Sequence, residues 1–170
     1  MIIATDVKYD EEEQTARAVA IAFEDWGAAR AAHEYVAHVD NVAEYVPGEF
    51  FRRELPCLHA VLKQVDVPIT AVIVDGHVWL GETPGLGHYL WTSIGCKWPV
   101  VGVAKSRFHA GGALEVCRGE STRPLYVSAV GIPDVLAANH VRGMHGPYRL
   151  PTMLKLVDKR TRVDDGDQRS

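Results

Sequence analysis

The chain has 170 residues, of which 47% are hydrophobic and 24% charged, a size and composition typical of one domain that buries a substantial core. No apolar run approaches the roughly 20 residues that a membrane-spanning helix needs, and Met1 leads into a strand-like segment instead of a signal peptide, so we expect a cytoplasmic protein without membrane contact. The 22 acidic and 18 basic residues give a net charge of −4, which does not by itself indicate a polyanionic partner.

The first half of the chain reads as three strands, a helix and a buried strand. Short polar links between the three strand-like stretches predict antiparallel neighbours. The wholly apolar run that follows the helix is typical of a central parallel strand covered on both faces. The predicted elements are strands at Ile2–Val7, Ala16–Phe23 and Glu34–Val39, a helix at Glu49–Val65 and a strand at Ile69–Val74.

The second half predicts further strands and helices, and then a polar tail. A Gly/Pro-rich loop spans Gly81–Gly85. It is followed by a helix at Leu86–Ile94, strands at Val100–Ala104, Leu114–Cys117 and Leu125–Ser128, and helices at Pro133–Met144 and Pro151–Arg162. We expect residues 1–163 to form one domain and 164–170 a polar tail. Three antiparallel strands followed by alternating helices and parallel strands predict an α/β, ribonuclease-H-like fold, with a mixed sheet and helices on both faces.

Three carboxylates occupy positions where apolar side chains are expected. Asp75 ends the buried strand, Asp6 lies in the first strand, and Glu54 interrupts the apolar stripe of the first helix. Asp75 could instead cap a turn, and Glu54 could instead pair with Arg53 or Arg107. Inward-facing acids repel one another unless a cation lies between them, and oxygen ligands without a cysteine partner favour Mg²⁺ or Mn²⁺ over zinc.

Five motifs in order make the chain resemble endonuclease V, a family that nicks nucleic acid near deaminated adenine. Their segments match the family's D-V-x-Y, Y-I-P-G with F-R-E, V-D-G-H, G-V-A-K-S and Y-R-L-P. In this chain the segments are Asp6–Tyr9, Tyr45–Gly48 with Phe51–Glu54, Val74–His77, Val101–Ser106 and Tyr148–Pro151.

The resemblance implies a Mg²⁺-dependent endonuclease in which Mn²⁺ would substitute. Such an enzyme would hydrolyse a phosphodiester bond near an inosine or distorted base in DNA or RNA. The implied metal ligands are Asp6, Glu54, Asp75 and Asp158, and Lys105 would stabilise charge on the phosphate or orient the water. The implied nucleic-acid contacts are a strand-separating turn of Tyr45, Pro47 and Gly48, and the segment Gly76, His77 and Val78.

Several of these residues have a plainer interpretation that the sequence leaves open. Lys105 could be a surface lysine, Tyr45 a packing residue at the entry of the helix, and His77 a hydrogen-bonded structural histidine. A further histidine, His88, is more simply explained by packing than by metal binding.

The chain departs from the family around the expected base pocket. Val78 stands where the family has a second glycine, so we expect its side chain to lie against the extruded base. The family's H-P-R-R stretch is replaced by Gly81–Gly85. Two alternatives follow: a nucleic-acid-binding or regulatory protein that has lost catalysis, or a structure-specific nuclease. The sequence does not fix DNA or RNA, the lesion or the oligomeric state, for which a monomer is the working expectation.

Overall fold

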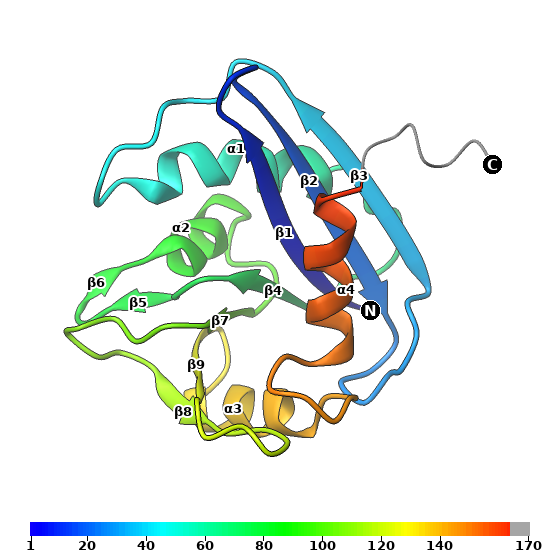
Figure 1. The fold of residues 1–170 in the computed structure, drawn as a ribbon, viewed down its shortest axis with the longest axis vertical. Coiled ribbons are helices and arrows are strands. Elements are labelled where there is room, and N and C mark those ends of the chain that lie inside the picture. Colours follow the sequence, from blue (N-terminus) through cyan, green and yellow to red (C-terminus); the bar gives the residue numbers. More distant parts are fainter. Residues whose placement is uncertain (164–170) are drawn as a thin grey trace.

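The computed structural model describes residues 1–163, which are built around a seven-stranded mixed sheet (Figure 1). The strand order is β3-β2-β1-β4-β7-β9-β8, and β5 and β6 form a separate two-stranded sheet. The strands are β1 (Ile2–Asp10), β2 (Thr15–Phe23), β3 (His33–Val39), β4 (Ala71–Asp75), β5 (Trp79–Leu80), β6 (Thr83–Pro84), β7 (Val100–Ala104), β8 (Leu114–Val116) and β9 (Leu125–Val130). The helices are α1 (Phe50–Leu62), α2 (Leu86–Ser93), α3 (Asp134–Gly143) and α4 (Thr152–Thr161).

The sheet confirms the predicted ribonuclease-H-like order, with one difference in its last strands. β1, β2 and β3 are antiparallel neighbours, and β4 and β7 continue the sheet in parallel with β1. β9 runs antiparallel to β7, and β8 antiparallel to β9, where parallel strands were predicted. The reason is the connection: no helix lies between β7 and β9, and a parallel neighbour requires a long crossover that is usually helical.

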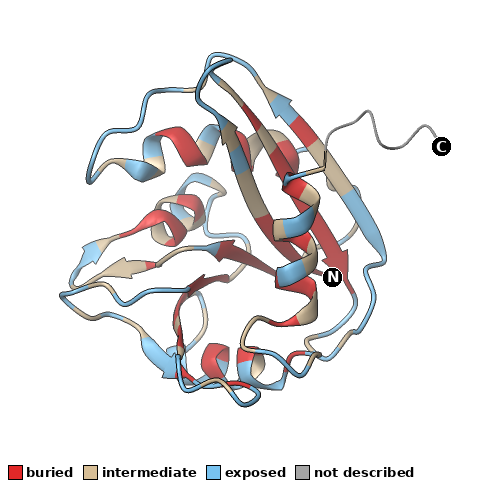
Figure 2. Ribbon diagram, viewed as in Figure 1, coloured by how far each residue is buried: buried red, intermediate tan, exposed pale blue. Residues whose placement is uncertain are grey.

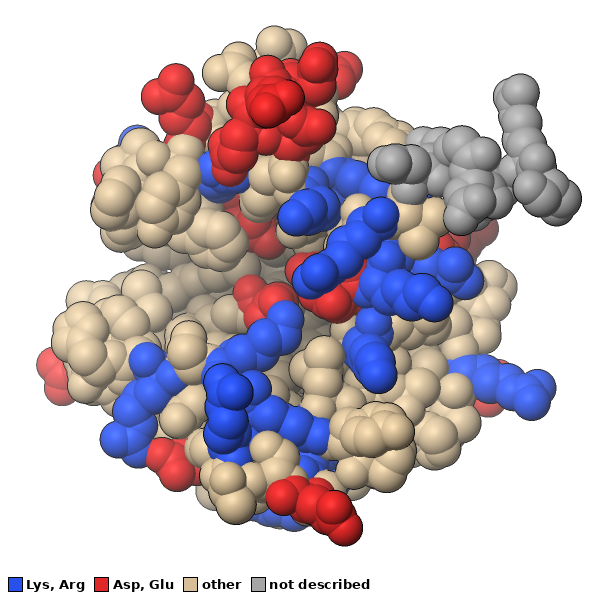
Figure 3. Space-filling model, viewed as in Figure 1, with Lys and Arg blue, Asp and Glu red and all other residues tan. Residues whose placement is uncertain are grey.

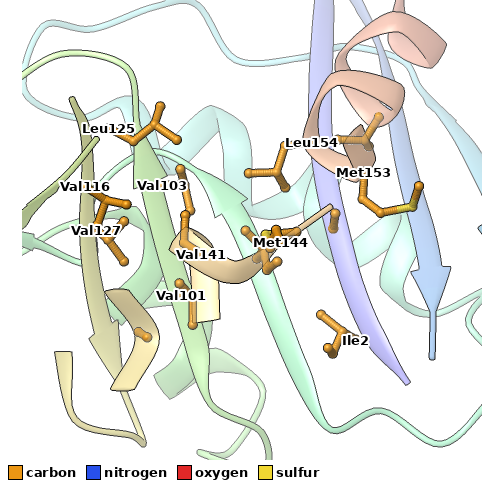
Figure 4. Close-up of a cluster of buried hydrophobic side chains, with 14 of the residues drawn as sticks. Ile2, Val101, Val103, Val116, Leu125, Val127, Val141, Met144, Met153 and Leu154 are labelled. Atoms are coloured by element: carbon orange, nitrogen blue, oxygen red, sulfur yellow. The ribbon is translucent and has the colours of Figure 1, made fainter. Parts of the chain in front are cut away.

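Alternating side chains of the strands build two cores, one on each face of the sheet. Ile2, Val19 and Ile21 pack with α3 and α4, whereas Ile3, Ala18 and Val72 pack with α1 and α2. Figure 2 shows the buried residues concentrated in the central strands and on the inner sides of the helices. In the first core, residues of α4 and of the α3 segment meet strand residues (Figure 4), and those labelled there include Met153, Leu154, Val141, Met144, Val101, Val103 and Val127.

A buried arginine holds the segment between α3 and α4. Arg118 is only 6% exposed, and its guanidinium donates hydrogen bonds to backbone carbonyls instead of pairing with an acid. The distances are 2.7 Å to Tyr148 and 3.1 Å to Gly146. The other accepting carbonyls are those of Arg142, Met144 and Arg149. Carbonyls that no helix or strand satisfies are thereby paired, which fixes the point at which α4 begins.

The chain after β4 packs so closely on its neighbours that two glycines are required. A Cβ on Gly102 of β7 would lie 2.5 Å from the carbonyl oxygen of Gly76, and a Cβ on Gly87 of α2 would lie 2.6 Å from Val78 Cγ2. Val78 is completely buried, and its amide donates to Ser128 Oγ at 2.9 Å. The residues immediately after Asp75 are therefore held by β7, β9 and α2.

The membrane, the cysteines and the division of the chain complete the description of the fold. No described helix is long and apolar enough to cross a membrane. Cys57, Cys96 and Cys117 are free cysteines. The division into one domain of residues 1–163 and a tail stays a prediction, and the tail, residues 164–170, lies outside the described residues.

Replacing Gly87 by alanine should destabilise the protein, because the added methyl group would overlap Val78. We expect Gly87→Ala to lower the free energy of unfolding by about 1–3 kcal/mol, the usual cost of overpacking. Adding Val78→Ala should recover part of that loss by removing the atoms that collide. Urea denaturation of the three proteins measures both effects.

Gly143→Ala is the matched control, because a Cβ at this helical position would meet nothing within 4 Å. It should be neutral or slightly stabilising. If Gly87→Ala were as stable as Gly143→Ala, the close packing between α2 and Val78 would be refuted.

Candidate active site

Three carboxylates line one hollow between the sheet and α4. Asp6 comes from β1, Asp75 ends β4, and Asp158 lies in α4. β1 and β4 are parallel, and their register pairs Ala4 with Ile73. Two residues further on, the same register brings Asp6 beside Asp75, both on the face that α4 covers. The carboxyl ends of parallel strands are where α/β sheets collect their ligands.

Lys105, just beyond the end of β7, lies among these carboxylates. Its Nζ is 3.0 Å from Asp75 Oδ2 and 3.8 Å from Asp158 Oδ1. Partial burial acts to lower the pKa of the Lys105 ammonium, but attraction to Asp75, Asp158 and Asp6 outweighs it, so the pKa is raised. Lys105 is therefore a fixed positive charge inside the acidic hollow, which disfavours its interpretation as an unengaged surface lysine.

Asp6 lies where burial opposes the ionisation of its carboxyl group. Burial, followed by repulsion from Asp75, raises the pKa of Asp6 from 3.8 to about 6, although the backbone N–H of Val7 opposes the shift. The hydroxyl of Thr161, at the end of α4, donates a hydrogen bond to Asp6 Oδ2 at 3.3 Å. The end of α4 thus contacts β1 at a carboxyl group whose ionisation burial opposes.

Glu54 approaches from the other face of the sheet, on α1. It is only 5% exposed, which confirms that it points inward. Burial raises the pKa of Glu54 from 4.5 to about 7; a hydrogen bond from the Tyr9 hydroxyl lowers it, and repulsion from Asp6 and Asp75 adds to the rise. Burial and the Glu54 charge also raise the pKa of Tyr9, so the phenol stays protonated and donates.

Neither arginine considered as a partner for Glu54 forms an ion pair with it. Arg53 pairs with Glu11 at 2.8 Å, and its guanidinium lies 3.7 Å from the centre of the Tyr9 ring. Arg107 pairs with Glu115. The Tyr9 hydroxyl is therefore the direct partner of the buried Glu54 carboxylate.

The four carboxylates suit a hard divalent cation in their chemistry. Asp6 and Glu54 are buried acids with raised pKa values, and each is repelled by Asp75. A cation bound among them would relieve this repulsion, and carboxylate oxygens are preferred ligands of Mg²⁺. As the side chains stand, no three His, Cys, Asp or Glu residues within the described range are arranged as a ready ligand set. Shared ligation by all four acids therefore stays a prediction.

An exposed aromatic turn and a second hollow lie beside the acids. Tyr45 is 58% exposed, so it is not a packing residue at the entry of α1, and Pro47 is exposed as well. Gly48 has a φ of +82°, which favours glycine. The neighbouring hollow is walled largely by apolar and aromatic groups, with the Phe51 and Tyr89 rings stacked 3.9 Å apart. Its lining includes Gly48, Phe50, Phe51, Gly76, His77, Leu86 and Tyr89.

Val78 is not part of this hollow, which corrects the prediction that its side chain lies against a bound base. It is completely buried, and its methyl groups face α2 near Gly87. Gly76 and His77 do line the hollow. His77 Nε2 lies 3.1 Å from the carbonyl oxygen of Ser106, while its Nδ1 finds no partner among the described residues.

Two contributors to the site have no predicted role. Tyr9 lies in the D-V-x-Y segment, three residues after Asp6, so strand alternation sends it to the face where Glu54 lies. That alternation was a usable signal. Thr161 comes from the last turn of α4, and no pattern in the sequence links it to Asp6.

The metal-free protein should become less stable as the pH rises from about 4.5 to 7. The pKa of Glu54 is raised to about 7 in the folded state, and that of Asp6 to about 6. Between these pH values the folded protein therefore holds protons that the unfolded chain has released. The stability that this proton binding contributes is fully present below the pKa values of the unfolded chain, and it is lost as the pH rises through the pKa values of the folded protein. For Glu54 the loss is on the order of 3 kcal/mol.

Chemical denaturation in a chelator at several pH values measures this dependence. Glu54→Gln should be less sensitive to pH in this window and more stable than the parent at pH 7. Glu120→Gln, which changes an exposed carboxylate, is the control. Equal pH dependence in both variants would show that Glu54 does not carry the cost.

Sequence comparisons place the chain with proteins of one kind. A profile of the endonuclease V family matches residues 1–131, which include Asp6, Glu54, Asp75 and Lys105 but not Asp158. Endonuclease V of Streptomyces coelicolor is 29% identical over 181 residues, covering 92% of this chain and 76% of the relative. Endonuclease V of Xylella fastidiosa is 33% identical over 107 residues, covering 63% of this chain and 44% of the relative.

Solved structures share the fold. The crystal structure of endonuclease V from Streptomyces avermitilis has a TM-score of 0.78 at 23% identity, covering 95% of this chain and 79% of that one. Endonuclease V from Ciona intestinalis, solved in complex with DNA that contains an inosine followed by a ribo-adenosine, has a TM-score of 0.77 at 17% identity, covering 95% and 83%. The family profile, together with this shared ribonuclease-H-like fold, places the chain in the endonuclease V family of nucleases.

Proposed function

We propose that the protein is a Mg²⁺-dependent endonuclease that hydrolyses a phosphodiester bond near a deaminated base, inosine, in DNA or RNA. The observation that carries the proposal is the shared hollow of Asp6, Asp75 and Asp158, with Lys105 among them. Acids that repel one another, one in the middle of β1 and one at the end of β4, are costly to the fold, and binding of a divalent cation would offset this cost.

Each residue at the proposed metal site has a distinct role. Asp6, Glu54, Asp75 and Asp158 would hold the ion, which when bound neutralises phosphate charge and lowers the pKa of a water. Tyr9 keeps the Glu54 carboxylate oriented through its hydroxyl. The Lys105 ammonium would leave its ion pair with Asp75 and pair with a phosphate oxygen of the substrate. Both partners are oxyanions, and the flexible lysine side chain can reach either one.

The base would be recognised on the other side of the acids. Tyr45 is exposed at the tip of the loop before α1, where an aromatic ring can enter a base step and unstack it. The apolar hollow beside it contains the stacked Phe51 and Tyr89, and an extruded base is read by stacking and polar contacts in such pockets. The Ciona intestinalis endonuclease V was solved with DNA that contains an inosine, which supports inosine as the base in question.

Asp75→Asn should abolish cleavage and leave the fold intact. The substitution removes a charge without opening a cavity, and the ion pair lost with Lys105 is about half exposed, so it contributes little to stability. In a chelator the variant should be as stable as the parent or more so. Mg²⁺ should raise the melting temperature of the parent, because it binds only the folded state, but not that of the variant.

The assay pairs a labelled oligonucleotide carrying one inosine with an undamaged strand, in DNA and RNA forms. Asp66→Asn is the control, since Asp66 is exposed after α1 and its carboxylate accepts a hydrogen bond from the Tyr35 hydroxyl. Cleavage by Asp75→Asn at the parental rate would eliminate the proposed mechanism. A folded parent that binds but never cuts would support the alternative of a binding protein.

Tyr45→Ala should weaken binding of the inosine strand by about 1–3 kcal/mol, the range for a base stacked on an aromatic ring. Tyr45→Phe keeps the ring and should bind like the parent, which makes it the matched control. Fluorescence anisotropy gives both affinities. If Tyr45→Ala and Tyr45→Phe bound equally well, the ring would have no wedging or stacking role.

A further inference from the structure

A basic hollow lies on the same face of the sheet as the acids, past the C-terminal end of α4. There β1, β2 and β3 extend beyond the helix (Figure 1). The basic side chains that line it are Lys8, Arg17 and Arg162, with the imidazole of His38 beside them. Figure 3 shows Lys and Arg side chains gathered over the end of α4 and the neighbouring strands, beside the acids at the centre of this face.

Strand register arranges three of these side chains in a row. Lys8 is opposite Arg17 in the β1–β2 pair, and Arg17 is opposite His38 in the β2–β3 pair. Directly opposed residues of antiparallel strands have Cα atoms about 4.5–5.5 Å apart and point to the same face. Lys8, Arg17 and His38 therefore cross three strands as a line of nitrogen groups.

The row begins next to the proposed cleavage site. Lys8 is two residues after Asp6 on the same strand, so it lies about 7 Å further along the same face at roughly 3.3 Å per residue. Arg162 links the two regions, because its Nη2 donates to Asp158 Oδ1 at 3.0 Å. The apolar hollow that would take the base is built from α1, α2 and the segment after β4. The acids thus lie between the base hollow and the basic one.

The contacts of Arg17 fix the floor of the basic hollow. Arg17 Nε donates to the carbonyl of Arg160 at 3.2 Å, and Arg17 Nη1 lies 3.4 Å from His38 Nε2. Lys8 and His38 are exposed. Among the described residues that line the hollow, Asp10 is the one carboxylate, and its Oδ1 already accepts two backbone N–H groups of the following turn.

We propose that this basic hollow is a phosphate subsite, which holds the nucleic-acid backbone on the side of the cleavage site away from the extruded base. The inference rests on the proposed function. It adds the side of the cleavage site on which the nucleic-acid backbone continues. A chain of net charge −4 needs local positive charge to attract a polyanion. Contacts to phosphates fix the register of the strand and carry no sequence information.

The test is the salt dependence of binding in an Asp75→Asn background, which prevents cleavage. Binding of a labelled inosine oligonucleotide is followed by fluorescence anisotropy across a series of NaCl concentrations. Lys8→Gln and His38→Gln are compared with Lys63→Gln, an exposed lysine after α1. Lys8→Gln should weaken binding several-fold and reduce the slope of log K against log salt by about 0.7 for a single strand or 0.9 for a duplex.

Shortening the oligonucleotide locates the contact. When nucleotides are removed one at a time from each end, the parent background should lose affinity at one step on one side of the inosine. Lys8→Gln should show no loss at that step. If Lys8→Gln and His38→Gln match Lys63→Gln in slope and in truncation profile, the subsite does not exist.

Two further comparisons separate the possible failures. The effect of inorganic phosphate on the melting temperature is compared with that of chloride at equal ionic strength. If phosphate stabilises the protein specifically, and Lys8→Gln abolishes that effect without changing the affinity for the oligonucleotide, the hollow binds a free anion and the proposal is overturned. Cleavage by the protein with Asp75 intact is measured separately. If the protein with Asp75 intact cleaves but Lys8→Gln leaves binding unaltered, the subsite alone is refuted. If Lys8→Gln changes the slope as predicted but the protein with Asp75 intact does not cleave, the nuclease is refuted and the subsite is kept.

Discussion

Mutual repulsion between the carboxylates of Asp6, in the middle of β1, and Asp75, at the end of β4, is the constraint on which the rest of the structure depends. Asp6 and Glu54 are held in a region where burial and neighbouring charge oppose ionisation. The ammonium of Lys105 pairs with Asp75, and the hydroxyls of Tyr9 and Thr161 donate hydrogen bonds to Glu54 and Asp6. These three groups come from the residue just after β7, from β1 and from the end of α4, so the sheet and α4 both take part in tolerating the acids.

The scaffold around this cluster is made rigid by close contact more than by ion pairs. Gly102 allows β7 to approach the backbone at Gly76, and Gly87 allows α2 to approach Val78. The Arg118 guanidinium fixes the segment that leads into α4 by binding its carbonyls. Catalytic groups must be held within fractions of an ångström, which packed backbone achieves better than exposed charge pairs.

The sequence predicts the scaffold well, because periodicity reports burial. The apolar stripe of α1 predicts that Glu54 faces inward, and the apolar run before Asp75 predicts a central strand; both are confirmed. The predicted orientation of Val78 was wrong because the strand alternation of side chains no longer determines their direction just past the end of a strand. The prediction that β9 is parallel to β7 was wrong because the direction of a strand depends on the path of the preceding loop, which residue patterns do not encode.

The hydrogen bond between Thr161 and Asp6 has a consequence for how the molecule is made. Its partners are separated by 155 positions, so one side of the hollow comes from the start of the sequence and the other from its last helix. Contacts of such long range form late, because the entropy of closing the loop must be overcome first. During synthesis the ribosome therefore releases β1 with Asp6 long before α4 can dock. Until then the growing polypeptide lacks Asp158, and its sheet cannot present an assembled acidic centre.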